Sequence, residues 1–323
     1  MKPLVLTLGD PAGIGAEIAV KAWQKLNGAL PFNLIGDFTY ITEVASSFGV
    51  ATQKVDTPTS ISDILPVLDI PLAVPIQPGF PNSQNAQAVI DAIALAVTLV
   101  QTDKASAIIT NPINKKALKD GAGFVFPGHT EFLADLAGGA FPVMMLSAPE
   151  LRVVPLTIHI PLSEVATQIT KDLLEKTIRV TSNALQRDLG IENPKIAVAG
   201  LNPHAGEGGV MGGEEITLIA PVLDNLRQDG FSILGPMSAD TMFHAEAREN
   251  YDLALCMYHD QALIPLKTLN FSQGVNTTLG LPFVRTSPDH GTAYDIAGKG
   301  IADPSSLIAA IQMAAEMSER RAG

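Results

Sequence analysis

The stretch IAVAGLNPH, residues 196–204, is an apolar run that ends in Asn-Pro-His. Residues 153–159, VVPLTIH, and residues 253–259, LALCMYH, have the same form. Runs of this composition are typical of strands that are buried on both faces of a parallel sheet. Because parallel α/β sheets place their chemistry outside the carboxyl ends of the strands, each histidine is predicted to lie at the functional edge.

Working outward from these runs, apolar strand-like segments alternate with longer helix-like segments along the chain. Strands are expected at 4–8, 32–35, 107–110, 153–158, 195–199, 232–235 and 253–258. Helices are expected at 14–27, 83–101, 163–188, 214–229 and 304–320. Residues 52–82, rich in Pro, Ser, Thr and Asp, are expected to be an irregular excursion with one short strand at most. The alternation predicts a parallel α/β architecture.

Size and charge limit the function. The chain has 323 residues, of which 46% are hydrophobic, and two domains are therefore expected. No apolar run reaches the roughly 18 residues of a membrane-spanning helix, and the N-terminal residues are typical of a strand and turn rather than a signal peptide. A net charge of −12 argues against nonspecific nucleic-acid binding, although a few local cations would suffice for a small anionic substrate. The single Cys256 excludes an intrachain disulfide, so we expect a cytoplasmic protein.

The first glycine-rich turn, GDPAGIGAE at 9–17, leads from a strand into a helix and is half of a dinucleotide-binding fingerprint. The third glycine of that fingerprint would fall at Ile18, whose branched side chain is unsuited to close helix packing. The alternative is a tight turn that opens a helix, whose free N–H groups could still face an anion.

Two later turns carry polar groups. Residues 128–130, Gly-His-Thr, are expected to open a helix over 131–136 with Thr130 as its cap, and His129 is then either functional or incidental. Residues 285–300 contain three glycines, two aspartates, one histidine and two basic residues. A purely structural loop of this composition would leave many backbone groups to satisfy, so we expect it to close over a polar ligand.

The histidines at the three strand ends leave two interpretations open. Each alone is more typical of a hydrogen-bonded core residue, whereas together His159, His204 and His259 could bind a divalent metal with open coordination positions, and Asp240 could add a carboxylate. Such a metal could acidify a substrate hydroxyl so that a hydride can leave, or it could activate water for hydrolysis. The pattern does not separate these reactions.

Long motifs across the chain resemble one enzyme family. They are GDPAGIGAE at 9–17, TNPINKKAL at 110–118, GHTEFLA at 128–134, LNPHAGEGG at 201–209, GPMSADTMF at 235–243, YHDQALIPLK at 258–267 and VNTTLGLPFVRTSPDHGTAYDIAGKG at 275–300. In these motifs the sequence is similar to the 4-hydroxythreonine-4-phosphate dehydrogenase (PdxA) family of vitamin B6 biosynthesis. The resemblance implies two α/β/α domains related to isocitrate and isopropylmalate dehydrogenases, with the active site in the interdomain cleft. The implied domains are 1–127 with 275–323, and 128–274, the second carrying the metal ligands and the dimer interface.

The resemblance also implies roles for individual residues. Zinc, magnesium or cobalt would be bound by His159, His204 and His259, in a site shared across a homodimer interface. A small phosphorylated amino acid would be bound by His129, Thr130, Lys267, Asn276 and Arg285. By analogy with the related dehydrogenases, NAD or NADP would be contacted by Asp289, His290, Gly291 and Asp295, in place of a Rossmann site at the first turn. Asp240 and Lys267 are the candidates for the catalytic base.

The implied reaction is the oxidation of the C3 hydroxyl of 4-phosphooxy-L-threonine. The resulting 3-oxo acid loses CO2 to give 3-amino-2-oxopropyl phosphate, in pyridoxal 5'-phosphate biosynthesis. A paralogue that oxidises 4-phospho-D-threonate or erythronate is the nearest alternative. A metal-dependent phosphohydrolase or acyl-phosphate transferase of the same fold is an alternative from another class, although neither needs a nicotinamide loop. A non-catalytic nucleotide-binding protein would not need the histidine set.

Overall fold

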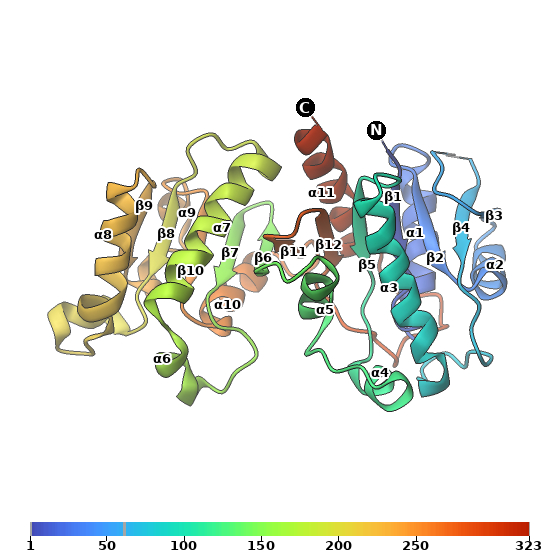
Figure 1. Ribbon diagram of the computed structural model, residues 1–323, viewed down its shortest axis with the longest axis horizontal. Coiled ribbons are helices and arrows are strands. Elements are labelled where there is room, and N and C mark those ends of the chain that lie inside the picture. Colours follow the sequence, from blue (N-terminus) through green and yellow to red (C-terminus); the bar gives the residue numbers. More distant parts are fainter. Residues whose placement is uncertain (1, 61–62, 323) are drawn as a thin grey trace. The chain divides into compact units, whose positions relative to one another are not determined.

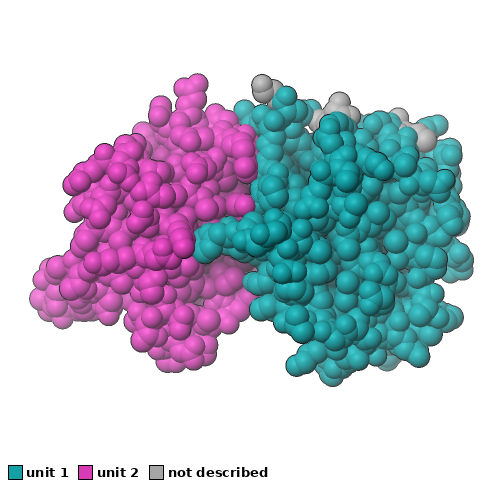
Figure 2. Space-filling view, in the orientation of Figure 1, with its two compact units in different colours: residues 1–142, 281–323 teal, residues 143–280 magenta. Residues whose placement is uncertain are grey.

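The computed structural model describes residues 2–60 and 63–322. The chain divides into two compact units, coloured separately in Figure 2. Unit 1 is Met1–Pro142 with Leu281–Gly323, and unit 2 is Val143–Gly280. These boundaries differ from the expected ones at 128 and 275. Phe132 and Leu133 of helix α5 (His129–Leu136) are buried in the core of unit 1, whereas strand β11 (Val275–Leu279) pairs with β6 (Val143–Ala148) in unit 2.

Unit 1 contains a parallel sheet in the order β3-β4-β2-β1-β5-β12. Its strands are β1 (Leu4–Thr7), β2 (Phe32–Gly36), β3 (Thr52–Val55), β4 (Leu65–Asp69), β5 (Ala107–Thr110) and β12 (Val284–Pro288). Its other helices are α1 (Gly15–Leu26), α2 (Phe38–Ser47), α3 (Ala86–Gln101), α4 (Lys115–Ala122) and α11 (Ser305–Ala322). In Figure 1, α3 lies in front of this sheet, while α1 packs against α2 and α11.

Helix α3 is the most apolar helix of unit 1. By length and hydropathy alone, the segment Ser83–Gln101 is one that could cross a bilayer. Its residues Val89, Ile93 and Val97 recur every four positions and are buried, and they pack against Ile35 and Ile108 of the sheet. Packing in the core of unit 1 therefore explains the apolar composition of α3.

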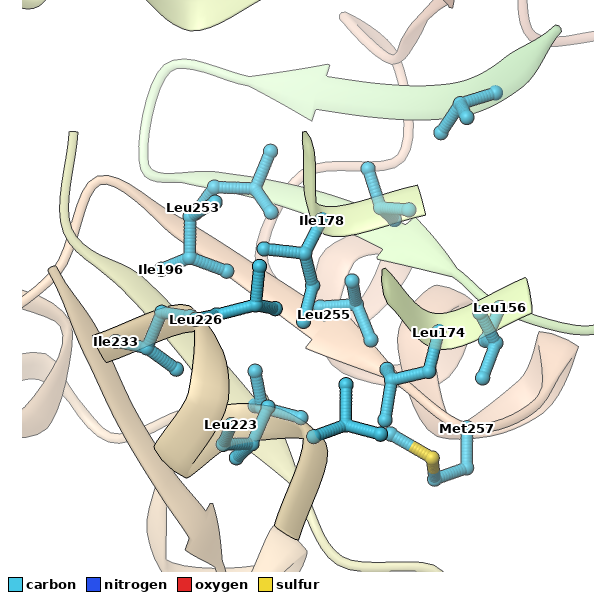
Figure 3. Close-up of a cluster of buried hydrophobic side chains, with 14 of the residues drawn as sticks. Leu156, Leu174, Ile178, Ile196, Leu223, Leu226, Ile233, Leu253, Leu255 and Met257 are labelled. Carbon is cyan, nitrogen blue, oxygen red and sulfur yellow. The ribbon is translucent and has the colours of Figure 1, made fainter. Parts of the chain in front are cut away.

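Unit 2 contains a mixed sheet in the order β11-β6-β7-β10-β8-β9. Its strands β7 (Leu151–Pro155), β10 (Leu253–Cys256), β8 (Ile196–Ala199) and β9 (Ile233–Met237) are parallel, and β6 and β11 join antiparallel. Its helices are α6 (Val165–Gln168), α7 (Lys171–Leu189), α8 (Ala220–Gln228), α9 (Ala245–Arg248) and α10 (His259–Leu269). Figure 3 shows Leu174 and Ile178 of α7 packed with Leu255 and Leu223 in the core.

The predicted parallel α/β pattern is confirmed, since all seven expected strands are present within a few residues of their expected bounds. The expectation for 52–82 was wrong, because β3 and β4 both form there, apart from residues 61 and 62, which lie outside the described residues. The expected helix at 163–188 is interrupted at Ile169–Thr170, where the Thr170 hydroxyl accepts a hydrogen bond from Leu173 N–H and caps α7.

Candidate functional site

The three histidines all belong to unit 2, and they follow the carboxyl ends of the adjacent strands β7, β10 and β8. Side-chain hydrogen bonds connect these strand ends to one another. The Thr157 hydroxyl donates to the carbonyl oxygen of Met257 at 2.8 Å. The Gln261 amide accepts from Met257 N–H at 2.7 Å and donates to the carbonyl oxygen of Gly200 at 2.9 Å. The loops that begin at this edge therefore start from fixed positions.

Two of the three histidines lie together. The ring centroids of His159 and His259 are 5.9 Å apart, with the rings tilted by 42°. With Zn–N bonds of about 2.0–2.1 Å, rings that share one cation have centres roughly 5 to 6 Å apart, so this pair fits a divalent metal. His259 Nδ1 lies 2.7 Å from Asp260 Oδ1. A carboxylate on the second ring nitrogen is the usual arrangement for a metal-binding histidine, and it leaves Nε2 for the metal.

The structure does not bring the third histidine into this pair. Within residues 2–60 and 63–322, no group of three His, Cys, Asp or Glu side chains is close enough to hold a metal ion. His204 instead lies near Asp240. It begins a run of five residues, 204–208, that all have left-handed backbone angles, including the non-glycine His204, Ala205 and Glu207. Left-handed geometry costs roughly 1–2 kcal/mol for each non-glycine residue, so this loop has to be held by its surroundings.

The two candidate catalytic bases differ in their surroundings. Asp240 is exposed, and a hydrogen bond from the Ser238 hydroxyl lowers the pKa of its carboxyl group, with a smaller contribution from His204. A low pKa makes Asp240 a weak proton acceptor, because a general base works best near the operating pH. Lys267 lies in the last turn of α10, with Nζ 5.8 Å from the centre of the Phe271 ring. Asn276 lies on β11, and its buried Oδ1 accepts no hydrogen bond from the described part of the chain.

In unit 1, a buried cation lies beside a neutral histidine. Arg285 on β12 is 3% exposed, and its Nη2 donates to the Thr110 hydroxyl at 2.7 Å. Burial lowers the pKa of Arg285 to about 10, against an opposing contribution from Glu131, so the guanidinium stays charged at neutral pH. Burial, followed by the charges of Arg285 and Lys115, holds the pKa of His129 well below its usual value.

His129 is the first residue of α5, and the expected capping role of its neighbour was wrong. The N-cap is Gly128, and no side chain makes a capping hydrogen bond there. The extended backbone at Gly128 lets the helix start directly at His129, so Thr130 lies inside the first turn. The buried Nε2 of His129 has no hydrogen-bond partner among the described residues. Buried polar atoms are normally paired, so this nitrogen is a candidate for contact with a ligand.

The first glycine-rich turn packs against the late loop, 285–300. Ile14 N–H donates to the carbonyl oxygen of Thr292 at 3.1 Å. Tyr294 donates to Asp10 at 3.0 Å and accepts from Asn114 at 2.8 Å. A Cβ atom at Gly15 would lie 2.1 Å from the carbonyl oxygen of Leu8, so glycine is required where α1 meets β1. Three motifs far apart in the sequence thus form one structural assembly.

The four expected cofactor residues lie in this late loop with different environments. The N–H of Asp289 donates to the Ser306 hydroxyl at 3.1 Å. His290 Nδ1 lies 2.9 Å from the carbonyl oxygen of Gly291, and the buried Nε2 of His290 has no partner in the described chain. Gly291 and Asp295 are exposed. Open backbone and unpaired polar atoms of this kind suit a loop that binds a ligand.

An ion pair that was not predicted from the sequence, Glu17 with Lys21, holds the end of this loop by hydrogen bonds. Glu17 Oε1 accepts from Ala302 N–H at 2.7 Å and from Lys21 Nζ at 2.7 Å. Lys21 Nζ also donates to the carbonyl oxygens of Ala302 and Gly300, at 2.8 and 2.9 Å. The i,i+4 spacing of Glu17 and Lys21 could have indicated this pair, but such spacing usually belongs to two solvated side chains on one helix.

A cavity of about 490 Å³ lies beside this ion pair. It is lined by Gly13, Glu17, Tyr40, Glu43, Val44, Ser47, Phe48, Gly298, Lys299 and Gly300.

Comparison with known proteins identifies the family. Residues 29–314 match the family model described as pyridoxal phosphate biosynthetic protein PdxA. The chain belongs to the PdxA family. PdxA relatives named 4-hydroxythreonine-4-phosphate dehydrogenase occur in Paracoccus denitrificans, 55% identical over 99% of each chain, and in Roseobacter denitrificans, 55% identical over 98% of each chain.

Solved structures agree with the PdxA assignment. The crystal structure of a 4-hydroxythreonine-4-phosphate dehydrogenase from Klebsiella pneumoniae is 38% identical, covers 98% of each chain and has a TM-score of 0.90. A branched-chain phosphotransacylase from Enterococcus faecalis and a β-decarboxylating dehydrogenase from Thermococcus kodakarensis are each 14% identical, with TM-scores of 0.56 and 0.51. At that identity the two proteins share the fold alone with this PdxA chain.

Proposed function

We propose that this PdxA-family protein is a 4-hydroxythreonine-4-phosphate dehydrogenase. It would oxidise the C3 hydroxyl of 4-phosphooxy-L-threonine with NAD or NADP, and the 3-oxo acid would then decarboxylate to 3-amino-2-oxopropyl phosphate. The observation that carries the proposal is the imidazole pair of His159 and His259, which follow the carboxyl ends of β7 and β10. Relatives that match the chain over nearly its full length are named 4-hydroxythreonine-4-phosphate dehydrogenase.

In this proposal, different residues bind the metal and the nicotinamide. His159 and His259 would hold a divalent cation, zinc, magnesium or cobalt, with Asp260 orienting the His259 ring. Asp289, His290, Gly291 and Asp295 would contact the cofactor. When bound, the cation supplies Lewis acidity toward the substrate hydroxyl and the nicotinamide accepts the hydride. His204 would be the third ligand.

The remaining side chains bind the substrate and move its proton. Arg285 and Lys267 would bind the phosphate and carboxylate groups, for which cationic donors are suited. His129, held neutral by burial, offers Nε2 for hydrogen bonding without adding charge. Thr130 and Asn276 would add neutral hydrogen bonds. Asp240 and Lys267 remain the candidates for the group that accepts the hydroxyl proton.

The metal site would be completed in a homodimer. Large apolar side chains are exposed in the segments that follow two of the proposed ligands. Val210 and Ile216 follow His204, at 81% and 55% exposure. Ile264 and Phe271, at 62% and 81%, follow His259. Gathered into one patch, such side chains would be typical of a protein interface. We place the enzyme in the cytoplasm, where its single buried Cys256 would stay reduced.

One assay tests the reaction. Reduction of NAD or NADP is followed with 4-phosphooxy-L-threonine and with 4-phospho-D-threonate, with and without EDTA. Turnover of the first substrate that EDTA abolishes is expected. A preference for the threonate would support the paralogue. Release of inorganic phosphate without nicotinamide reduction would support the phosphohydrolase alternative.

The assay has a matched pair of variants. His259→Asn removes a proposed ligand, whereas His244→Asn changes an exposed histidine that caps α9 and can be replaced by another capping residue. Loss of activity is expected only for His259→Asn. Full activity of His259→Asn, equal to that of His244→Asn in buffer that contains the metal, would rule out the proposed metal role.

A further inference from the structure

The loop that carries His204 has a backbone that its own residues do not favour. From His204 to Gly208, all five residues have φ between +43° and +80°. Glycine adopts such angles readily, but His204, Ala205 and Glu207 do not. Backbone of this kind persists only where the surrounding structure over-determines it, and it concentrates at functional sites.

The buried carboxylate of Glu215 lies against the backbone of this loop. Glu215 is 3% exposed. Its Oε1 accepts a hydrogen bond from Asn202 N–H at 2.8 Å, and its Oε2 accepts one from Asn202 Nδ2 at 3.0 Å. Asn202 is the residue before Pro203 and the left-handed run, so Glu215 fixes the point at which the loop begins.

The same carboxylate also occupies the space beside the loop backbone. A Cβ atom at Gly206 would lie 2.6 Å from Glu215 Oε2, and one at Gly200 would lie 3.1 Å from Oε1. Both positions are glycine, which lets the chain approach the carboxylate closely. Glu215 therefore contacts the strand end, the start of the loop and the middle of the left-handed run.

The helix that supplies Glu215 is irregular at this point. Residues Glu215–Ile219 form a π-helical turn that leads into α8. Such turns are mostly single insertions in α-helices, and they are frequent at functional sites. The carboxylate of its neighbour Glu214 accepts from Asn202 Nδ2 at 2.8 Å but not from the Asn202 N–H, and Glu214 is partly exposed.

We propose that Glu215 is a positioning residue that acts through Asn202 to hold the left-handed run 204–208 and thereby presents His204 for metal binding. The proposal rests on the proposed function, because it takes His204 as a metal ligand. Glu215 itself contacts neither the substrate nor the cation in this role. The carboxylate matters because it offers one acceptor oxygen to each Asn202 donor, whereas the amide of Gln would place an NH2 group against one of them.

The test compares Glu215→Gln with Glu214→Gln in the full-length protein without metal. Hydrogen exchange of the backbone is measured by mass spectrometry. In Glu215→Gln, exchange of residues 203–210 is expected to rise at least tenfold while α7 and α8 keep their wild-type rates. Glu214→Gln is expected to raise exchange of residues 203–210 much less, because Asn202 N–H keeps its hydrogen bond to Glu215.

Metal binding gives the second measurement. Titration with Co²⁺ is expected to show a loss of affinity of about 10- to 100-fold in Glu215→Gln. Adding Ala205→Gly to Glu215→Gln is expected to recover part of that loss, because glycine adopts the left-handed angles without strain. A purely structural role for Glu215 would give no such recovery.

The two proposals fail in different ways. If His204→Ala binds Co²⁺ as tightly as the wild type, the proposed metal role of His204 fails. If His204→Ala loses binding but Glu215→Gln binds and exchanges like Glu214→Gln, the positioning role alone is overturned. Faster exchange spread over all of unit 2 in Glu215→Gln would also overturn it.

Discussion

The side chain of Gln261 donates a hydrogen bond to the carbonyl oxygen of Gly200 at 2.9 Å, across 61 residues of sequence. The same amide accepts from Met257 N–H at 2.7 Å. The end of β10, just before His259, is thereby joined to the end of β8, which leads to His204. These two strand ends are therefore connected by a side chain as well as by the pairing of β10 with β8.

Replacing Gln261 with Leu is expected to lower the free energy of unfolding by about 1–3 kcal/mol, because Met257 N–H and the Gly200 carbonyl lose their partner. Weaker Co²⁺ binding is expected as well. Urea unfolding and metal titration measure the two effects. The control is Gln273→Leu, at an exposed position, and equal losses in both variants would contradict the prediction.

Replacing Asp260 with Asn is expected to weaken metal binding by about 10- to 100-fold with little effect on folding, because Asp260 orients the His259 ring from the exposed side. Titration of the metal-free protein with Co²⁺ measures this. Asp224→Asn, at an exposed residue that pairs with Arg227, serves as the control. Wild-type affinity in Asp260→Asn would contradict the orienting role.

Replacing Arg285 with Lys is expected to raise KM for the phosphorylated substrate at least tenfold and KM for the nicotinamide much less. Lysine keeps the charge but loses the planar guanidinium, which donates to Thr110 and would at the same time bind the substrate anion. Steady-state kinetics with each substrate varied in turn measure the split. Arg320→Lys, in the exposed last turns of α11, is the control, and equal increases in both KM values would argue against anion binding.

The stability of the protein is expected to fall as the pH drops below about 6.5, the usual histidine pKa, in part because of His129. The folded state holds the pKa of His129 well below that value, so the unfolded chain binds a proton first and is favoured in acid. Urea unfolding at pH 7.5 and pH 5.5 measures the difference. The loss should be smaller in His129→Gln and unchanged in His244→Asn, and identical losses in all three proteins would contradict the assignment.

Replacing Glu17 with Gln is expected to lower the free energy of unfolding by about 1–3 kcal/mol and to raise KM for the nicotinamide several-fold. The variant weakens the bonds to Ala302 N–H and Lys21 that fasten the end of the late loop. Urea unfolding and cofactor kinetics provide the measurements. Glu43 lines the same cavity, and Glu43→Gln serves as the control. A similar result for that variant would show that the bonds from Glu17 to the loop are not the cause.

Much of the fold could be predicted because it depends on local pattern. The runs at 153–158, 195–199 and 253–258 consist of residues that favour buried strands, and each stops where polar residues begin, so both the strands and their functional ends are visible in the sequence. At most one of β3 and β4 was expected, because their surroundings are rich in Pro, Ser, Thr and Asp. Pairing of β4 with β2, and of β3 with β4, supplies the stability that local propensity does not. Strands β6, β11 and β12 were also not among those predicted.

The sequence by itself determined the parallel α/β class, the strand ends that carry the histidines, and the motifs that place the chain in its family. Only the tertiary structure decided which side chains meet. Arg285 reaches Thr110 across 175 residues, and Glu17 reaches Ala302 across 285. It also decided that His259 pairs with His159 while His204 lies on a separate left-handed run. The physical reason is that strand formation is encoded within a few neighbouring residues, whereas burial of a charge and orientation of a ring depend on partners that folding alone brings close.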